Sequence, residues 1–201
     1  MTMTGSARGS YAKTPGRRRE IIEAGIEVFS TSGFRKGSIR EVAEQVGMSQ
    51  AGLLHHFSNK NELLAAVLEL RDDIARARVR IDQVPGIGMI RGVIDLVDYN
   101  ASVPGLVSLY CVLSAEATSP DHPAYAYFRN RYEWTVGLIS ESLTAMKQAG
   151  ELIDGAEPGE IAKMLVALMD GLQVQWLMDP TSVDMAAYVR HYMQTQMTVA
   201  L

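Results

Sequence analysis

Apolar residues recur at helical spacing in a short segment near the N-terminus. They stand three, four and seven positions apart and therefore share one face of a helix. These positions are Ile39, Val42, Ala43 and Val46. Ser38 and Glu41 predict a capping box at the start of this helix, because the hydroxyl and the carboxylate can each accept from a free main-chain N–H. Gly47 predicts its end, since glycine tolerates the left-handed conformation common at helix ends.

A second short helix is predicted directly after the first, capped by Ser49 and running to His55. Its first turn carries only small or polar groups, at Ser49, Gln50, Ala51 and Gly52. Leu53 and Phe57 face the core. A helix with a bare, polar N-terminal end can lie in the major groove of DNA. An ordinary helical hairpin that binds no DNA has the same pattern, so the hairpin alone leaves both interpretations open.

Longer helical patterns flank this pair. A first helix is expected from about Arg17 to Ser32, ending at Gly33, with its basic N-terminus near the DNA backbone. Its apolar face carries Ile21, Ile22, Ile26 and Phe29. Asn59 and Glu62 predict the cap of a fourth helix, which continues to about Arg80 and connects the two parts of the protein. Tilting this connector would move the recognition helices of a dimer relative to each other.

The chain from Val84 onward predicts five more helices. Proline and glycine punctuate segments of helical periodicity, and no segment alternates cleanly in the manner of a strand. From Ile161 to Met178 apolar groups lie on more than one face, and the segment 185–197 carries a further stripe, at Ala186, Val189, Met193 and Met197. Such excess apolar surface predicts a homodimer through the last two long helices. Burial within the monomer is the alternative.

The charge of the chain divides unevenly between its two parts. The 201 residues, 47% of them hydrophobic, suffice for one large or two small domains, and the net charge is −4. Residues 1–60 hold nine Lys or Arg against five Glu, a net of +4, which leaves ten against eighteen acidic residues, a net of −8, for 61–201. A basic N-terminal end favours a nucleic-acid partner, although an accidental imbalance of this size is an open alternative.

Several other classes of function find no support in the sequence. Cys111 is the only cysteine, and no secretory signal is seen, so we expect a reducing cytoplasm. The longest uncharged stretch, 99–115, is broken by proline, glycine and polar residues, so no membrane partner is expected. No catalytic set, cofactor loop or metal-ligand spacing is present, since Gly86-Ile87-Gly88 lacks a preceding strand. We therefore expect no enzyme, no cofactor and no metal.

Soft and aromatic side chains in the second part predict a small-molecule cavity. The candidates for its lining are Tyr99, Tyr110, Cys111, Glu116, Trp134, Met164, Met169, Asp170, Gln173 and Trp176. Each residue singly has a simpler interpretation, because Met and aromatic residues at helical spacing are usually core, and Glu116 can face water. The lack of clustered basic residues there weighs against a highly phosphorylated ligand.

The segment from Met48 to Leu63 resembles the N-terminal DNA-binding domain of the TetR family of bacterial transcriptional regulators. This segment and the residues before it carry motifs in the order that family uses: Phe29, Gly33-Phe34, the run 39–43, and His56-Phe57-x-x-Lys60-x-x-Leu63. The resemblance covers about Arg17 to Leu70. Beyond it, Met169-Asp170-Gly171-Leu172 is similar to one subgroup of the family's sensor domains.

The resemblance implies an all-α fold, with an N-terminal three-helix helix-turn-helix domain joined to a larger helical ligand-binding and dimerisation domain. We expect a flexible basic arm over 1–15, the DNA-binding domain over 16–62 and the larger domain over 63–201. The resemblance also implies that Arg40, Gln50 and Gly52 face bases, that Ser49 and His56 lie at the DNA backbone, and that Lys60 contacts phosphate. Ala51 and His55 complete the expected DNA-binding set. Where many relatives have a phosphate-contacting tyrosine, this chain has Leu54.

The function implied is a ligand-responsive regulator, with double-stranded DNA and a small-molecule effector as partners. The homodimer would bind a near-palindromic operator, more as a repressor than an activator, and a small, largely apolar effector would release it. Two alternatives come from other classes. One is a helical enzyme acting on an apolar substrate, and the other is a small-molecule-binding or scaffolding protein without sequence-specific DNA binding.

Overall fold

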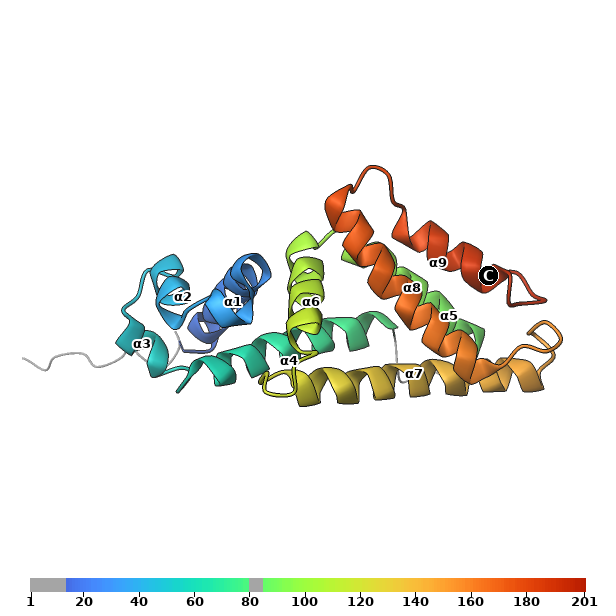
Figure 1. The fold of residues 1–201 in the computed structure, drawn as a ribbon, viewed down its shortest axis with the longest axis horizontal. Helices are drawn as coiled ribbons and strands as arrows, with labels where there is room; N and C mark the ends of the chain where they lie inside the picture. The colour runs from blue at the N-terminus through green and yellow to red at the C-terminus, as the bar shows by residue number, and fades with distance from the viewer. Residues whose placement is uncertain (1–13, 80–84) are drawn as a thin grey trace, which may run out of the picture.

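The computed structural model describes residues 14–79 and 85–201, which are mostly helical, with short loops between the helices (Figure 1). The predicted arm therefore lies outside the described residues, except for its last two positions, and so does the predicted end of the connector at Arg80. The described helices are α1 Thr14–Lys36, α2 Ile39–Gln45, α3 Gln50–Leu54, α4 Lys60–Val79, α5 Ile87–Asn100, α6 Pro104–Glu116, α7 Tyr125–Gln148, α8 Pro158–Met178 and α9 Met185–Gln194. This confirms the predicted all-α class.

The local signals at the start of the chain have the predicted effect. The Ser38 hydroxyl accepts from the Glu41 N–H at 3.2 Å, and the Glu41 carboxylate accepts from the Ser38 N–H at 2.7 Å. Ser49 caps α3 by accepting from the Gly52 N–H at 3.1 Å. Gly33 has a φ of 72° and breaks α1 at the predicted place, although helical residues continue to Lys36. These contacts set where α2 and α3 begin.

Helix α4 connects the two halves of the molecule. Asn59 caps it by accepting from the Glu62 N–H at 2.9 Å, as expected. The Glu62 carboxylate, however, accepts from the Ser58 N–H at 2.7 Å, so the second half of the cap closes one residue earlier. The first turns of α4 are buried among the N-terminal helices, whereas Val79 at its far end is buried in the other half.

One hydrophobic cluster, called here the N-terminal cluster, crosses the boundary predicted at residue 62. It joins α1 to α4 with α6 and the start of α7, and its fully buried members include Phe29, Leu53, Phe57, Leu63, Leu109 and Leu113. Figure 1 shows α6 standing between α1 and α8. Because α6 shares a core with the helix-turn-helix, the two halves are packed together rather than joined by a free linker.

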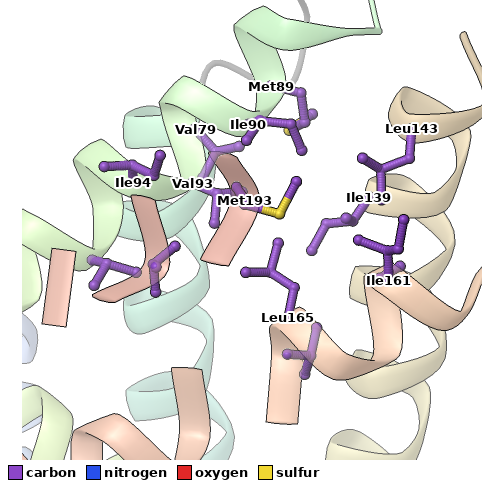
Figure 2. Close-up of a cluster of buried hydrophobic side chains, with 14 of the residues drawn as sticks. Val79, Met89, Ile90, Val93, Ile94, Ile139, Leu143, Ile161, Leu165 and Met193 are labelled. Atoms are coloured by element: carbon purple, nitrogen blue, oxygen red, sulfur yellow. The ribbon is translucent and has the colours of Figure 1, made fainter. Parts of the chain in front are cut away.

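The second cluster, called here the C-terminal cluster, fills the space between α5, α7, α8 and α9 (Figure 2). Val189, Met193 and Met197 are buried in it, so this stripe of α9 packs within the monomer, as the alternative interpretation holds. Helix α8 is long and apolar enough to span a membrane by length and composition alone, and α5 with α6, bent by 104°, passes the same test as a pair. Core helices of globular proteins also meet this criterion, so it carries little weight.

Candidate functional site

The outer face of α2 and α3 is open to solvent. Leu53 and Phe57 are fully buried and anchor α3 from below, as predicted. The residues expected to face DNA lie on the opposite side: Arg40, Ser49, Gln50, Ala51 and His55 are exposed, and Gly52, His56 and Lys60 are half-buried. The structure therefore leaves the predicted set accessible on α2, on α3 and at the start of α4.

Two arginines of α1 hold this surface in place from behind. Arg18 donates to the main-chain oxygen of His56 at 2.7 Å, and its guanidinium lies 4.0 Å from the centre of the Phe57 ring. Arg17 donates to the main-chain oxygen of Val46 at 2.5 Å. Their guanidinium groups thus satisfy carbonyls at the ends of α2 and α3. The expectation that this basic helix start lies near the DNA backbone stays a prediction, and a phosphate would have to compete with these main-chain acceptors for the two guanidiniums.

Lys60 lies beside α1 in the described structure. Its ammonium is 4.3 Å from the centre of the Phe34 ring and 3.5 Å from the main-chain oxygen of Arg35. Burial lowers the pKa of this lysine, while the carboxylates of Glu116 and Glu41 act in the opposite sense. A phosphate at the start of α4 would have to compete with these contacts for the ammonium.

A cavity of about 80 Å³ lies in the other half of the molecule. Five of the predicted candidates line it, namely Tyr110, Trp134, Met169, Asp170 and Gln173. Apolar side chains from α4, α5, α7 and α8 complete most of the wall, including Val79, Met89, Val93, Leu96, Leu138, Ile139 and Val166. Its walls thus come from the connector helix and from the helices of the C-terminal cluster.

The other five candidates lie elsewhere. Tyr99 borders a separate hollow of about 10 Å³, and the Cys111 thiol lies behind the wall, 3.9 Å from the Gln173 amide oxygen. Trp176 is buried in the C-terminal cluster, and Met164 is 59% exposed. For these residues helical spacing gave the right helix but not the face that meets the cavity.

The prediction for Glu116 is wrong, because its carboxylate lies between the two halves of the molecule. It accepts from the Phe34 N–H at 2.8 Å, and the buried His122 ring nitrogen is 3.6 Å from it. Nearby, the Ser108 hydroxyl donates to the main-chain oxygen of Ser30 at 3.0 Å. Helix α6 is thereby tied to α1 on either side of the break at Gly33.

Charged residues that the sequence did not single out also line the cavity. Arg71 and Asp72 come from α4, and Arg131 comes from α7. Asp72 accepts from Arg131 and, at 2.9 Å, from the Tyr127 hydroxyl. Arg71 stacks on the Tyr110 ring with its guanidinium carbon 4.0 Å from the ring centre. The expectation of no clustered basic residues here is wrong, since residues some 60 positions apart meet only after folding.

Two further groups near the cavity have shifted pKa values. The Tyr132 hydroxyl donates to the Asp170 carboxylate at 2.7 Å. Burial nevertheless raises the pKa of Asp170 above its usual range, because removing the charged carboxylate from water costs more than the hydrogen bond returns. Burial also raises the pKa of the Cys111 thiol to about 11, which keeps it protonated and unreactive. No cluster of three or more His, Cys, Asp or Glu side chains that could hold a metal occurs within 14–79 and 85–201.

Comparisons with known proteins agree with this geometry. The family model described as "Bacterial regulatory proteins, tetR family" matches residues 21–67, and that described as "BetI-type transcriptional repressor, C-terminal" matches residues 108–198. The transcriptional regulator TtgR of Pseudomonas putida is 28% identical over 189 residues, which cover 89% of this chain and 88% of TtgR.

Two solved structures have the same fold. A TetR-family regulator from Rhodococcus sp. aligns with a TM-score of 0.73 at 23% identity and covers 92% of this chain and 100% of its own. SmeT of Stenotrophomonas maltophilia in complex with triclosan aligns with a TM-score of 0.70 at 16% identity, covering 89% of this chain and 88% of its own. These likenesses extend across both halves of the molecule.

Proposed function

Because the chain belongs to the TetR family of bacterial regulatory proteins, and is thus a ligand-responsive transcriptional regulator, we propose that it acts as a homodimeric repressor. It binds a near-palindromic operator and is released by a small, largely apolar effector. The observation that carries this proposal is the position of α4, which starts beside the exposed α2–α3 surface and also lines the apolar cavity.

Base recognition falls to the exposed groups of this surface. Gln50 can pair bidentately with adenine and Arg40 with guanine. Ser49 and His56 lie where the DNA backbone would pass, Gly52 allows close approach, and Ala51 and His55 flank the contact. Leu54 is 38% exposed on α3 and cannot donate a hydrogen bond to phosphate. Lys60 supplies the phosphate contact when its ammonium leaves the Phe34 ring.

The dimer forms through an exposed apolar stripe on α8. The outward positions of this helix recur at three- and four-residue spacing and are apolar or small: Met164, Ala167, Gly171, Val174 and Met178. On α9, Tyr188 adds a side chain that is 53% exposed. Two copies packed antiparallel along these helices would bury this surface in a four-helix arrangement. The two α3 helices would then lie about 34 Å apart, in successive major grooves.

The small size of the cavity explains how an effector would release the protein from its operator. A volume of 80 Å³ accommodates a few waters but no drug-sized molecule, so an effector must push the helices around it apart. Because α4 forms part of the wall, this movement displaces the helix-turn-helix. The effector therefore binds better to the conformation in which the two α3 helices are wrongly spaced for the operator. SmeT, which has this fold, forms a complex with triclosan.

The cytoplasm, where the DNA lies, is the compartment in which this protein would act. We assign no catalytic residue to the cavity. The relatives in the comparisons are regulators.

The purified protein should be incubated with fragments of genomic DNA from its own source at near-physiological salt, and the retained fragments sequenced. The expected result is enrichment of a two-fold-symmetric site, with affinity that falls steeply as salt rises. The same experiment with Gln50→Ala should lose the enrichment of that site. A folded protein that enriches no sequence would contradict the proposed function and favour a ligand-binding or scaffolding protein.

A further inference from the structure

One guanidinium nitrogen in the cavity wall has no hydrogen-bond acceptor. Nη1 of Arg71 is buried, and nothing in the described part of the chain accepts a hydrogen bond from it. The Asp72 carboxylate is 3.6 Å away, too far for a hydrogen bond, and that carboxylate already accepts from Arg131 and Tyr127. A buried donor left without an acceptor is costly, and a charged donor more so.

Charge in this part of the cavity is also unbalanced. Arg71 and Arg131 both lie against the Tyr110 ring, at 4.0 and 5.7 Å, and share the single carboxylate of Asp72. Burial and the neighbouring Arg131 charge both lower the pKa of Arg71, as expected for a guanidinium short of negative partners. The other cavity carboxyl, Asp170, accepts from the Tyr132 hydroxyl at 2.7 Å, and within the described residues no hydrogen bond or ion pair joins it to Arg71 or Arg131.

We infer that the effector is an amphipathic organic acid whose carboxylate binds the free edge of Arg71 while its apolar body fills the space between α5, α7 and α8. A guanidinium presents parallel donors that match a carboxylate, and stacking on Tyr110 already holds this one in a fixed plane. The body would contact Met89, Val93, Leu138 and Met169. This inference rests on the proposed function in one respect, namely that the cavity is the effector site.

Such a ligand would act directly on the connector helix. Arg71 belongs to α4, so a carboxylate held by its guanidinium is bound to the helix that carries the helix-turn-helix at its other end. An apolar body wedged against α7 and α8 then pushes on the opposite wall. The carboxylate and the apolar body of the ligand thus act on different helices. Neither part alone would separate α4 from α7 and α8 as effectively.

The test is direct binding to the free protein by calorimetry, with phenylacetate, 4-phenylbutyrate and octanoate each compared with its primary amide. The acid and the amide have the same shape and differ in charge. At least one acid should bind about tenfold or more tightly than its amide, the ratio expected from one charge-assisted hydrogen-bonded pair. Arg71→Gln should reduce that ratio to within about twofold, and Arg129→Gln, which removes an exposed guanidinium from α7, should leave it unchanged.

Three results would overturn the inference: equal binding of acids and amides, tighter binding of the amides, or no binding of any acid at about 1 mM, a dissociation constant that corresponds to only about 4 kcal/mol. The comparison on the unsubstituted protein stands even if Arg71→Gln fails to fold. Operator binding is measured separately by the retention experiment. If an acid binds but the protein has no affinity for an operator, the proposed function is refuted and the anion site stands. If the protein binds an operator but shows no preference for acids, the anion site is refuted and the proposed function stands.

Discussion

The Glu116 carboxylate of α6 accepts a hydrogen bond from the main-chain N–H of Phe34 at 2.8 Å. Phe34 follows the glycine that breaks α1, so its N–H lacks a helical partner and finds one in the other half of the molecule. Six residues before Glu116, Tyr110 on the same helix lines the cavity. Helix α6, like α4, therefore contacts both the cavity and the N-terminal helices.

Replacing Glu116 by alanine should destabilise the protein. The Phe34 N–H loses its acceptor, and the free energy of unfolding should fall by about 1 to 3 kcal/mol. Glu116→Gln retains an acceptor and should cost less. Denaturant unfolding followed by circular dichroism measures both, with Glu133→Ala, an exposed position on α7, as the control. A loss no larger than that of the control would show that this contact is not part of the stable fold.

Gly33→Ala should be destabilising by more than about 1 kcal/mol. The φ of 72° disfavours any residue with a Cβ, and that atom would lie 2.4 Å from the Glu116 carboxylate oxygen. Gly137→Ala is the matched control, since a Cβ there meets nothing within 4 Å and the residue lies within α7. Helix propensity predicts that the control gains about 0.5 to 1 kcal/mol. Thermal unfolding of both variants is the measurement, and a stable Gly33→Ala would refute the role of the break.

Gln50→Ala and Lys60→Ala should affect DNA binding differently. Removing Gln50 should reduce discrimination between bases by about 1 to 3 kcal/mol and leave stability unchanged, because this exposed side chain faces solvent. Removing Lys60 should weaken binding to all sequences and lower the salt slope by about one unit. Titrations of cognate and scrambled operators at several salt concentrations separate the two effects. If both variants bind the cognate operator as tightly as the parent protein, the assigned roles are wrong.

Val174→Asp should convert the dimer to a monomer. Val174 lies in the middle of the exposed α8 stripe and is 43% exposed, so the charge is tolerated in the free monomer but would be buried without a partner in the dimer. Light scattering after gel filtration gives the mass directly. Ile153→Asp, at a residue 40% exposed outside the α8 and α9 helices, should remain dimeric. A dimeric Val174→Asp would place the interface on another face.

Asp170 should make stability depend on pH. Burial raises its pKa in the folded protein, so the folded state binds the proton more tightly than the unfolded chain does. The associated stability is present below the unfolded value of about 3.9 and is lost as pH rises through the folded value. The free energy of unfolding of Asp170→Asn, relative to that of the parent protein, should therefore be higher at pH 7 than at pH 4. Denaturant unfolding at both values tests this, with the exposed Asp95→Asn as control; equal differences at both pH values would contradict the shift.

Local signals in the sequence were sufficient for the helix-turn-helix. The capping box at Ser38, the cap at Ser49 and the break at Gly33 depend on neighbours within a few residues, so they can be read from the chain directly. The roles of Arg17 and Arg18 could not be predicted in this way, because their acceptors lie 29 and 38 residues away in the sequence, at the ends of α2 and α3.

The cavity could be predicted only in part. Tyr110, Trp134, Met169, Asp170 and Gln173 line it because they lie on helices with more apolar surface than one core requires. Trp176 and Met164 satisfy the same pattern, yet one is buried in the core and the other faces solvent. Helical periodicity gives relative angles along one helix and not the rotation of that helix about its axis. The Arg71, Asp72 and Arg131 cluster depends on the packing of α4 against α7, which no short segment encodes.

If the cavity is the effector site, its small volume sets how the regulator responds to the effector's concentration and how fast it responds. If only a fraction of the molecules have the cavity open wide enough for the effector, its apparent dissociation constant is multiplied by the inverse of that fraction. Low background levels of a fitting molecule would leave the operator occupied, and association would be limited by the rate at which α4 and α7 separate. Substitutions that shorten side chains at Met89 or Met169 would then lower the threshold of induction without changing the operator.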